Sequence, residues 1–468
     1  MSARYSFMIP LIVGCAQFMH QFDGAVIATA LPSMARSMRE DPLQLNLAIT
    51  CYLLALAVFV PISGWLADRF GAKRIYILAI VVFTVSSMLC GLSSTLPELV
   101  ISRVLQGIGG AMMTPVGRVI VVKSVPRADL VKAMSYVTIP GALAPLLGPS
   151  VGGFIVTYFS WPWIFFMNLP IGILGIILVM IHIPEIKEDE VVPLDRAGFL
   201  LAAVSLASLM LGFESMGRDL LPTPVVIALL VGGSLCGAIY VWHARRIDNP
   251  IIDFSLLRIP TFKAAITGGG LFYVTTTSMV FLLALLLQLG FGFTAFEAGL
   301  TMLAGAFGSL LTRFIFQPVL RAVGFRNLLV GNAALSGLYL IACGFFQIST
   351  PFVLMLMILF IGGLSRATHF TAVQSFTYAD MPSSLMSRAT SFSAMAQQLA
   401  QTFGVGVTAL VIHLSMSWRG GTLVTAADIA PAFFTIAVAV LGSTLVFLTL
   451  PKDAGAEIGN VGRPRDPR

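Results

Sequence analysis

Long apolar runs alternate with short polar loops along the whole of this 468-residue chain. A helix that crosses a bilayer needs about 20 mostly apolar residues. Runs of that kind recur along the sequence, and they predict an all-α polytopic membrane protein with fourteen transmembrane helices. The expected helices cover residues 7–30, 45–67, 75–94, 97–122, 132–158, 162–183, 197–217, 222–243, 262–289, 295–318, 326–347, 351–375, 387–414 and 429–450.

The positions of the basic residues predict how the chain is oriented in the membrane. Cytoplasmic loops of membrane proteins are enriched in Lys and Arg. If the N-terminus is cytoplasmic, most of the 28 basic residues fall in cytoplasmic segments, and only Arg36, Arg39, Arg218 and Arg419 fall in external loops. An even number of helices returns the chain to its starting side, so we expect both termini in the cytoplasm.

Composition narrows the class of protein further. The chain is 57% apolar and only 10% charged, whereas soluble domains carry about 25% charged residues. Its net charge of +7 is not arranged as a basic stripe with interleaved aromatic residues, so nucleic acid is not an expected partner. The sequence has no CxxC, HExxH, GxSxG or Walker motif, which argues against a thiolate metal site, an intramembrane enzyme and ATP hydrolysis.

A weak internal repeat divides the chain. The segment GWLADRFGAKR at 64–74 is similar to QPVLRAVGFRN at 317–327, with an offset of 253 residues. That offset spans eight expected helices, so two helices are inserted between two six-helix halves, and internal repeats of this kind are typical of transporters. The predicted units are an N-terminal half (1–183), two inserted helices with flanking loops (184–258), a C-terminal half (259–450) and a disordered cytoplasmic tail (451–468).

Asp23 lies inside the first apolar run, where an ionisable side chain is costly and marks a candidate functional site. Arg103 lies at a similar depth in a later helix, since both residues are roughly 10 Å from the expected external helix ends at about 1.5 Å per residue. Pairing favours the ionised carboxylate, while loss of water favours the protonated one. We therefore expect Asp23, with Arg103, to carry protons; a static ion pair that orients two helices is the alternative.

Glycine and proline clusters mark candidate gating segments. Glycines in the 64–74 loop allow a tight turn, and its carboxylate and basic residues can hold the cytoplasmic face; a plain basic hairpin is the alternative. Prolines and glycines over 140–153 predict a kinked, closely packed helix, with a packing kink without gating as the alternative. The glycines of a third segment, 103–111, are expected to serve close helix packing. The candidate gating or structural residues of the three segments are Gly64, Asp68, Arg69, Gly71, Lys73, Arg74, Gln106, Gly107, Gly109, Pro145, Gly148, Pro149, Gly152 and Gly153.

Several of these segments together resemble one known family. RVLQGIGGA at 103–111 resembles the helix-4 motif of the major facilitator superfamily, and 64–74 resembles its loop motif between helices 2 and 3. GPSVGG at 148–153 is similar to the antiporter motif of helix 5. DGAVIATALP at 23–32 and WPWIFFMNLPIG at 161–172 are similar to signatures of the fourteen-helix drug:proton antiporter family, and within it of the MdtD-like branch of multidrug exporters.

This resemblance implies a major facilitator fold with two six-helix halves plus two extra central helices. It also implies a proton-coupled antiporter in the cell inner membrane that works by alternating access, with the proton gradient as its energy source and no cofactor. Asp23 and Arg103 would couple protons, Asp68 and the basic residues after it would latch the cytoplasmic side, and 148–153 would pack against the second half. The sequence departs from the family pattern at Ala28, Ala144 and Arg321.

Cargo in such transporters binds near the midplane between the halves. Aromatic and Met side chains suit varied apolar cargo, and amides in a membrane need polar partners; ordinary packing or lipid contact is the alternative for each Phe or Met. The candidate cavity residues are Phe18, Met19, Phe22, Met113, Phe272, Tyr273, Gln374, Gln397, Gln398 and Gln401, with Gln106 beside them.

The charge of the cargo stays open from the sequence. Arg118, Arg313 and Arg366 also fall within expected helices, where they either extend to the membrane interface or line an inner vestibule that favours anions. We therefore expect an exporter of small amphipathic compounds, with an exporter of an organic anion or metal chelate as the alternative and a passive facilitator as a third. We expect a monomer whose two inserted helices are a spacer or a docking surface for a partner protein.

Overall fold

The structure is a computed structural model that describes residues 5–40, 42–126, 129–187, 193–216, 221–421, 424–451 and 454–455. These residues form helices joined by short connections, and no strand occurs among them. The predicted all-α fold is confirmed. The predicted tail, 451–468, falls almost wholly outside the described residues.

Every predicted apolar range falls on a helix or on two consecutive helices. The helices are α1 (Tyr5–Met38), α2 (Pro42–Phe59), α3 (Ser63–Phe70), α4 (Ala72–Leu92), α5 (Leu96–Ser124), α6 (Leu130–Tyr158), α7 (Trp163–Phe166), α8 (Asn168–His182), α9 (Arg196–Ser215), α10 (Thr223–Ala244), α11 (Pro260–Leu285), α12 (Ala295–Gly344), α13 (Phe352–Phe376), α14 (Met386–Arg419) and α15 (Ala426–Leu448). Short helical turns η2 (Phe254–Arg258), η3 (Leu286–Gly290) and η4 (Ser383–Leu385) lie between them.

The described residues contain ten helices that are long and apolar enough to cross a membrane, or eleven if the bent pair in α2 and α3 is one span. Two predicted ranges, 295–318 and 326–347, share α12, which bends at Gly324 with a φ of 77°. A positive φ is readily adopted only by glycine. The structure thus supports a polytopic membrane protein, and the number fourteen stays a prediction.

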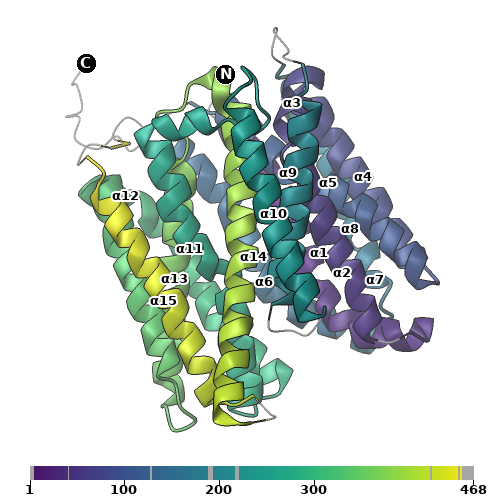
Figure 1. Cartoon of the computed structure of the whole chain (residues 1–468), viewed down its shortest axis with the longest axis vertical. Helices are drawn as coiled ribbons and strands as arrows, with labels where there is room; N and C mark the ends of the chain where they lie inside the picture. Colours follow the sequence, from purple (N-terminus) through teal and green to yellow (C-terminus); the bar gives the residue numbers. More distant parts are fainter. Residues whose placement is uncertain are drawn as a thin grey trace.

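The helices gather into two groups, with α1 to α8 on one side and α11 to α15 on the other (Figure 1). In the first group α1 packs on α6 and α5 packs on α2 and α4; in the second α12 packs on α13 and α15. The groups meet where α14 contacts α3 and α5, and where α6 contacts α12 and α13. We call this contact zone the seam.

The two inserted helices lie across the front of the bundle in Figure 1. Helix α9 packs on α2 of the first group and on α14 of the second, and α10 packs mainly on α9. The inserted pair therefore contacts both groups. The predicted division at 183 and 258 stays a prediction.

Several helix starts follow one local pattern. Helices α5, α12 and α15 each begin after a threonine whose side chain caps the helix together with an acidic residue three positions later, at Thr95 and Glu98, Thr294 and Glu297, and Thr425 and Asp428. This capping box satisfies backbone N–H groups that have no partner inside the helix. The starts of these helices are thus specified by the local sequence.

Glycines allow the helices of the first group to approach closely. A Cβ atom added at Gly107 of α5 would lie 2.5 Å from the carbonyl oxygen of Tyr52 and 2.8 Å from the Cβ of Ala55, both on α2. A side chain there would force α2 and α5 apart. The close approach places Tyr52 beside the polar residues of α5, which form the site described below.

We predict that Gly107→Ala destabilises the protein by about 1–3 kcal/mol, because the added methyl group overpacks the contact between α2 and α5. Gly270→Ala in α11 is the matched control, since a Cβ there meets no atom within 4 Å. Thermal unfolding of both variants in detergent measures the effect. Equal unfolding midpoints for Gly107→Ala and Gly270→Ala would contradict the proposed close contact.

Candidate functional site: a buried ion pair beside a polar cavity

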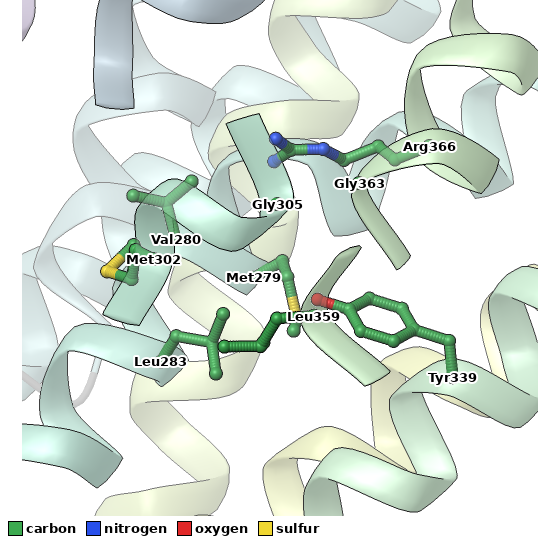
Figure 2. A pocket seen from close by; sticks show the side chains of 9 residues that line it. All are labelled: Met279, Val280, Leu283, Met302, Gly305, Tyr339, Leu359, Gly363 and Arg366. Atoms are coloured by element: carbon green, nitrogen blue, oxygen red, sulfur yellow. The ribbon is translucent and has the colours of Figure 1, made fainter. Parts of the chain in front are cut away.

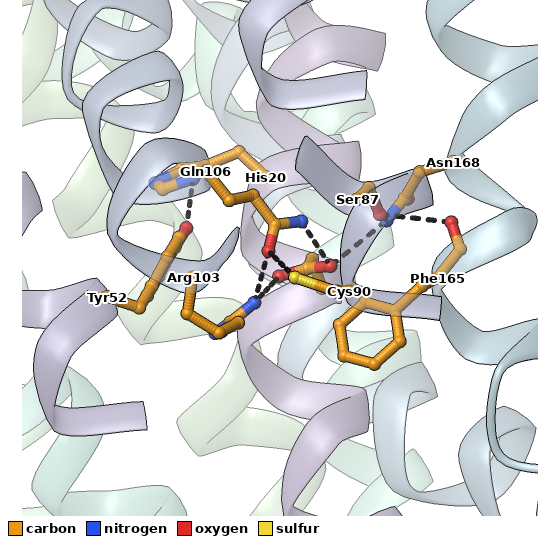
Figure 3. Close-up of polar contacts among 9 residues, drawn as sticks. His20, Tyr52, Ser87, Cys90, Arg103, Gln106, Phe165 and Asn168 are labelled. Atoms are coloured by element: carbon orange, nitrogen blue, oxygen red, sulfur yellow. Dashed lines mark hydrogen bonds and ion pairs between the residues drawn. The ribbon is translucent and has the colours of Figure 1, made fainter. Parts of the chain in front are cut away.

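A buried ion pair joins two helices of the first group, and Figure 3 shows the polar contacts around it. Nη1 of Arg103 on α5 lies 2.6 Å from Oδ2 of Asp23 on α1. The two side chains are 0% and 1% exposed. The structure therefore brings together the two residues that the sequence places at similar depth.

The second carboxylate oxygen of Asp23 is also fully engaged. Oδ1 accepts hydrogen bonds from Nε2 of Gln106 at 2.9 Å and from Nδ2 of Asn168 at 3.0 Å. Gln106 in turn accepts from Nη1 of Arg103 at 2.6 Å. Charge-assisted hydrogen bonds of this kind replace the water that a carboxylate loses on burial. The cluster joins α1, α5 and α8.

Asn168 was not among the residues predicted for the site. It also donates to Oγ of Ser87 on α4 at 2.9 Å, and Ser87 donates to the carbonyl oxygen of Phe165 at 3.0 Å. The available signal was a single amide within the apolar run WPWIFFMNLPIG at 161–172. An amide in hydrocarbon needs a polar partner, and the partner here is Asp23.

Tyr52 and His20 extend the cluster on the other side of Arg103. The guanidinium carbon of Arg103 lies 4.1 Å from the centre of the Tyr52 ring. The hydroxyl of Tyr52 lies 2.7 Å from Nδ1 of His20. Within the described residues, Nε and Nη2 of Arg103 are buried without a hydrogen-bond partner. The guanidinium is thus held by one carboxylate, one amide and one aromatic face.

A small polar cavity lies next to His20, between α1, α2, α5 and α14. It offers about 40 Å³ to water-sized molecules, which is room for roughly three waters at about 10–15 Å³ each. The cavity is at the seam, because α14 belongs to the second group. Its polar lining residues are Gln17, His20, Gln21, Thr114, Gln397, Gln398 and Gln401.

The other predicted cavity residues lie elsewhere. Phe18 and Phe22 stack on each other with ring centres 5.3 Å apart, Met19 and Met113 are each 1% exposed within the main hydrophobic core, and Phe272 packs on His369. Gln374 bonds to the hydroxyl of Tyr273 at 3.0 Å and to Oε1 of Gln397 at 2.9 Å. In this conformation, amides rather than aromatic residues line the cavity.

Asp68 connects the two groups at the predicted cytoplasmic end. Its Oδ1 accepts a hydrogen bond from Oγ of Ser387 on α14 at 2.5 Å and lies 3.9 Å from Nζ of Lys123 on α5. A Cβ at Gly64 would lie 2.6 Å from the carbonyl oxygen of Ser387. The start of α14 is therefore held tightly against α3, and this end of the seam is closed.

The basic residues of the same loop make different contacts. The guanidinium of Arg69 lies 5.6 Å from the ring centre of Trp65, Lys73 donates to the carbonyl oxygen of Met180 at 2.8 Å, and Arg74 lies 3.6 Å from Glu185. Gly71, with a φ of 94°, lies against the Glu185 carboxylate. Lys73 and Arg74 thus hold the segment to the end of α8, whereas Gly64 and Asp68 contact α14.

The glycines of α5 and α6 pack inside the first group. A Cβ at Gly109 would lie 2.7 Å from the backbone nitrogen of Phe83 on α4, and one at Gly148 would lie 2.6 Å from the Cβ of Ala25 on α1. Gly148 thus faces α1, whereas the family resemblance places its segment against the second half. Gly152 is buried and Gly153 has open space around it. The side chains of Pro145 and Pro149 are outside the described part of the structure.

Comparison with known proteins identifies the family. The model of the Major Facilitator Superfamily matches residues 13–405. A protein of Klebsiella pneumoniae named "Putative multidrug resistance protein MdtD" is 36% identical over 456 residues, which cover 95% of each chain. A protein of the same name from Serratia proteamaculans is 40% identical over 408 residues, covering 86% of this chain and 84% of the relative. The chain belongs to the major facilitator superfamily, as its motifs predict.

Solved structures agree with this fold. The human organic anion transporter MFSD10 matches with a TM-score of 0.62 and 13% identity over 96% of this chain and all of the other. The proton:xylose symporter XylE matches with a TM-score of 0.67 and 15% identity over 98% and 99% of the two chains. At this identity the likeness shows the fold alone. The family match and the MdtD relatives show that the chain is a multi-pass membrane transporter and not an enzyme.

We predict that Arg103→Met destabilises the protein by about 3–5 kcal/mol, because it leaves the Asp23 carboxylate buried without its cation. Adding Asp23→Asn should restore part of the loss, since a neutral amide needs no counter-ion. Thermal unfolding of the single and double variants in detergent measures both effects. The control is Arg74→Met, which breaks an exposed pair worth about 0–1 kcal/mol.

A double variant no more stable than Arg103→Met alone would show that lost packing, rather than the unpaired charge, causes the destabilisation.

We predict that Asp68→Ala opens the predicted cytoplasmic end of the seam, because it removes the bond to Ser387 and the charge next to Lys123. The reporter is a cysteine at Thr114, which lines the cavity, in a chain whose native cysteines are replaced. In inside-out vesicles this cysteine should react with a thiol reagent several-fold faster when Asp68→Ala is present than when it is absent. Arg69→Ala is the matched control, since Arg69 is next to Asp68 on the same helix, α3, and stacks on Trp65.

Labelling that is equally fast in Asp68→Ala and Arg69→Ala would contradict a specific role of Asp68 in closing the seam.

Proposed function

We propose that this chain is a proton-coupled antiporter that exports small amphipathic compounds across the bacterial inner membrane by alternating access. The observation that carries the proposal is the buried Asp23–Arg103 pair, one helical turn from a polar cavity at the seam. The names of the relatives, multidrug resistance protein MdtD, support the kind of cargo. The termini are proposed to be cytoplasmic, as the basic loops predict.

Asp23 is the proposed proton carrier because it is a titratable group joined to three helices. Its carboxylate links α1 to Arg103 and Gln106 on α5 and to Asn168 on α8. A proton on Asp23 would remove the charge that holds Arg103. The guanidinium, which already has two nitrogens without hydrogen-bond partners among the described residues, would then seek another acceptor. Protonation would in this way loosen α1 against α5.

The closed cytoplasmic end of the seam indicates from which side the proton would reach Asp23. Asp68 and Ser387 hold α3 against α14 at the predicted cytoplasmic end, so the proposed cavity is shut off from that side. In an exporter, a proton from outside would bind Asp23 as cargo leaves outward. The protonated protein would then open inward, release the proton to the cytoplasm and accept new cargo. The proton gradient is the proposed energy source, without a cofactor, and the proposed working unit is a monomer.

We predict that Asp23→Asn abolishes cargo-driven proton release. Inverted membrane vesicles are acidified inside, and proton release is followed with a pH-sensitive dye on addition of cationic, neutral and anionic compounds. Wild type should release protons with at least one compound, and Asp23→Asn with none. Glu98→Gln is the matched control, because Glu98 is a carboxylate at the exposed start of the same α5 helix, and Gln also forms a capping box.

Compound-driven proton release that persists in Asp23→Asn would refute Asp23 as the carrier. Compound movement in wild type without any proton movement would instead indicate a passive facilitator.

A further inference from the structure

Arg118 is a second buried arginine on α5, 15 residues beyond Arg103 and thus about 22 Å along the helix axis at about 1.5 Å per residue. It is 2% exposed. Its Nη2 donates across the seam to Oε1 of Gln397 on α14 at 3.0 Å. Its Nη1 is buried and has no hydrogen-bond partner among the described residues.

The surroundings of Arg118 differ from those of Arg103 in charge. Arg103 has the Asp23 carboxylate at 2.6 Å, whereas no carboxylate of the described residues forms an ion pair with Arg118. A buried charge without a counter-ion is strongly unfavourable, and an amide oxygen offers only a dipole in its place. The seam therefore contains a cation whose charge the described protein does not neutralise.

One amide separates this cation from the cavity. Oε1 of Gln397 accepts from both Arg118 and Nε2 of Gln374, and Gln397 also lines the cavity. Oε1 of Gln374 is buried without a hydrogen-bond partner in the described part of the chain. Arg118, Gln374 and Tyr273 thus form a hydrogen-bonded network that reaches the cavity through Gln397, and part of its bonding capacity is unused.

The other two intramembrane arginines have different surroundings. Arg313 donates to the hydroxyl of Tyr136 at 3.0 Å and lies over its ring. Arg366 points into a smaller cavity of about 20 Å³ within the second group, between Met279, Gly305 and Tyr339 (Figure 2). Neither bonds to the residues that line the cavity at the seam. Among the described contacts, Arg118 alone of the three bonds to a residue that lines the cavity at the seam.

We infer that Arg118 is the binding site for an anionic group of the cargo, so the compounds exported by the proposed antiporter include organic acids with a carboxylate. When the seam opens to the cytoplasm, α14 would carry Gln397 away and free both terminal nitrogens of Arg118. These two donors match the two oxygens of a carboxylate. When the seam closes, Oε1 of Gln397 returns to Arg118 and displaces the carboxylate towards the cavity.

The cavity suits such a group. Its described lining has amides, a histidine and a threonine but no carboxylate, so it can donate hydrogen bonds to an anion without repelling it. The nearby acid, Asp23, is already paired with Arg103. Because Asp23, paired with Arg103, would handle the proton and Arg118 the anion, proton and cargo would bind beside two different levels of α5. The inference rests on the proposed antiport.

The test measures binding of matched acids and amides to the full-length protein in detergent by calorimetry. The probes are benzoate with benzamide and 2-naphthoate with 2-naphthamide. Wild type should bind at least one acid about tenfold more tightly than its amide. Arg118→Gln should bring the two affinities within about twofold without weakening the amide, and Arg118→Lys should keep part of the preference. Arg366→Gln is the matched control and should leave the preference unchanged.

Two further variants test the displacement step. Gln397→Leu should bind the acid several-fold more tightly, because the competing oxygen is gone, and Asp68→Ala should do the same by opening the seam. No preference for either acid in wild type and in Asp68→Ala, or a preference that survives Arg118→Gln, would overturn the inference.

The vesicle assay separates this inference from the proposed antiport. An acid that depends on Arg118 for binding but moves without protons would refute antiport and keep the anion site. Proton release that depends on Asp23 and follows only cationic or neutral compounds, without binding of either acid, would keep antiport and overturn the anion site.

Discussion

A bilayer cannot solvate an ion or an amide, so each polar side chain inside the helices must find its partner in the protein. The ion pair between Asp23 and Arg103 is the clearest consequence. Its carboxylate draws donors from α5 and α8, and Asn168 extends the bonds to α4. The carboxylate on α1 thus bonds directly to α5 and α8, and it is linked to α4 only through Asn168. In the proposed cycle, a proton on Asp23 would weaken the direct bonds to α5 and α8 together.

Helix α5 carries the polar chemistry of the first group on two levels. Arg103 lies beside Asp23, whereas Arg118 reaches across the seam to an amide of α14. Arg103 is neutralised by Asp23, which belongs to the same group of helices. Arg118 is held by the Gln397 amide of α14, which would move away when the seam opens. The first arrangement suits a titrating site that persists through the cycle. The second suits a ligand that is bound in one conformation and displaced in another.

The sequence predicts how deep a residue lies in the membrane better than which neighbouring helix its side chain faces. Hydropathy and helix rise placed Asp23 and Arg103 at one level, and the structure places their atoms in contact. They did not identify Asn168, Tyr52 or His20, because these contacts depend on which faces of neighbouring helices meet. A membrane helix is apolar on its lipid face and on its packed face alike, so composition alone does not separate them. For the same reason Met113 and Phe272, expected at the cavity, lie in the core, while the glutamines of α14, which need polar partners, line it.

Helix α14 makes contacts that close the seam at several points along its length. At its start Ser387 bonds to Asp68, and Arg388 contacts Asp253 at 3.5 Å in the segment after α10. Further along, Gln397 bonds to Arg118, and Phe403 packs on Phe213 of α9 with ring centres 5.1 Å apart. If the bond between Asp68 and Ser387 broke and α14 moved as one body, Gln397 would move away from Arg118. The contact between Phe403 and Phe213 of the inserted pair would shift in the same motion. The inserted helices therefore lie where they can bias the same motion that exposes the proposed anion site.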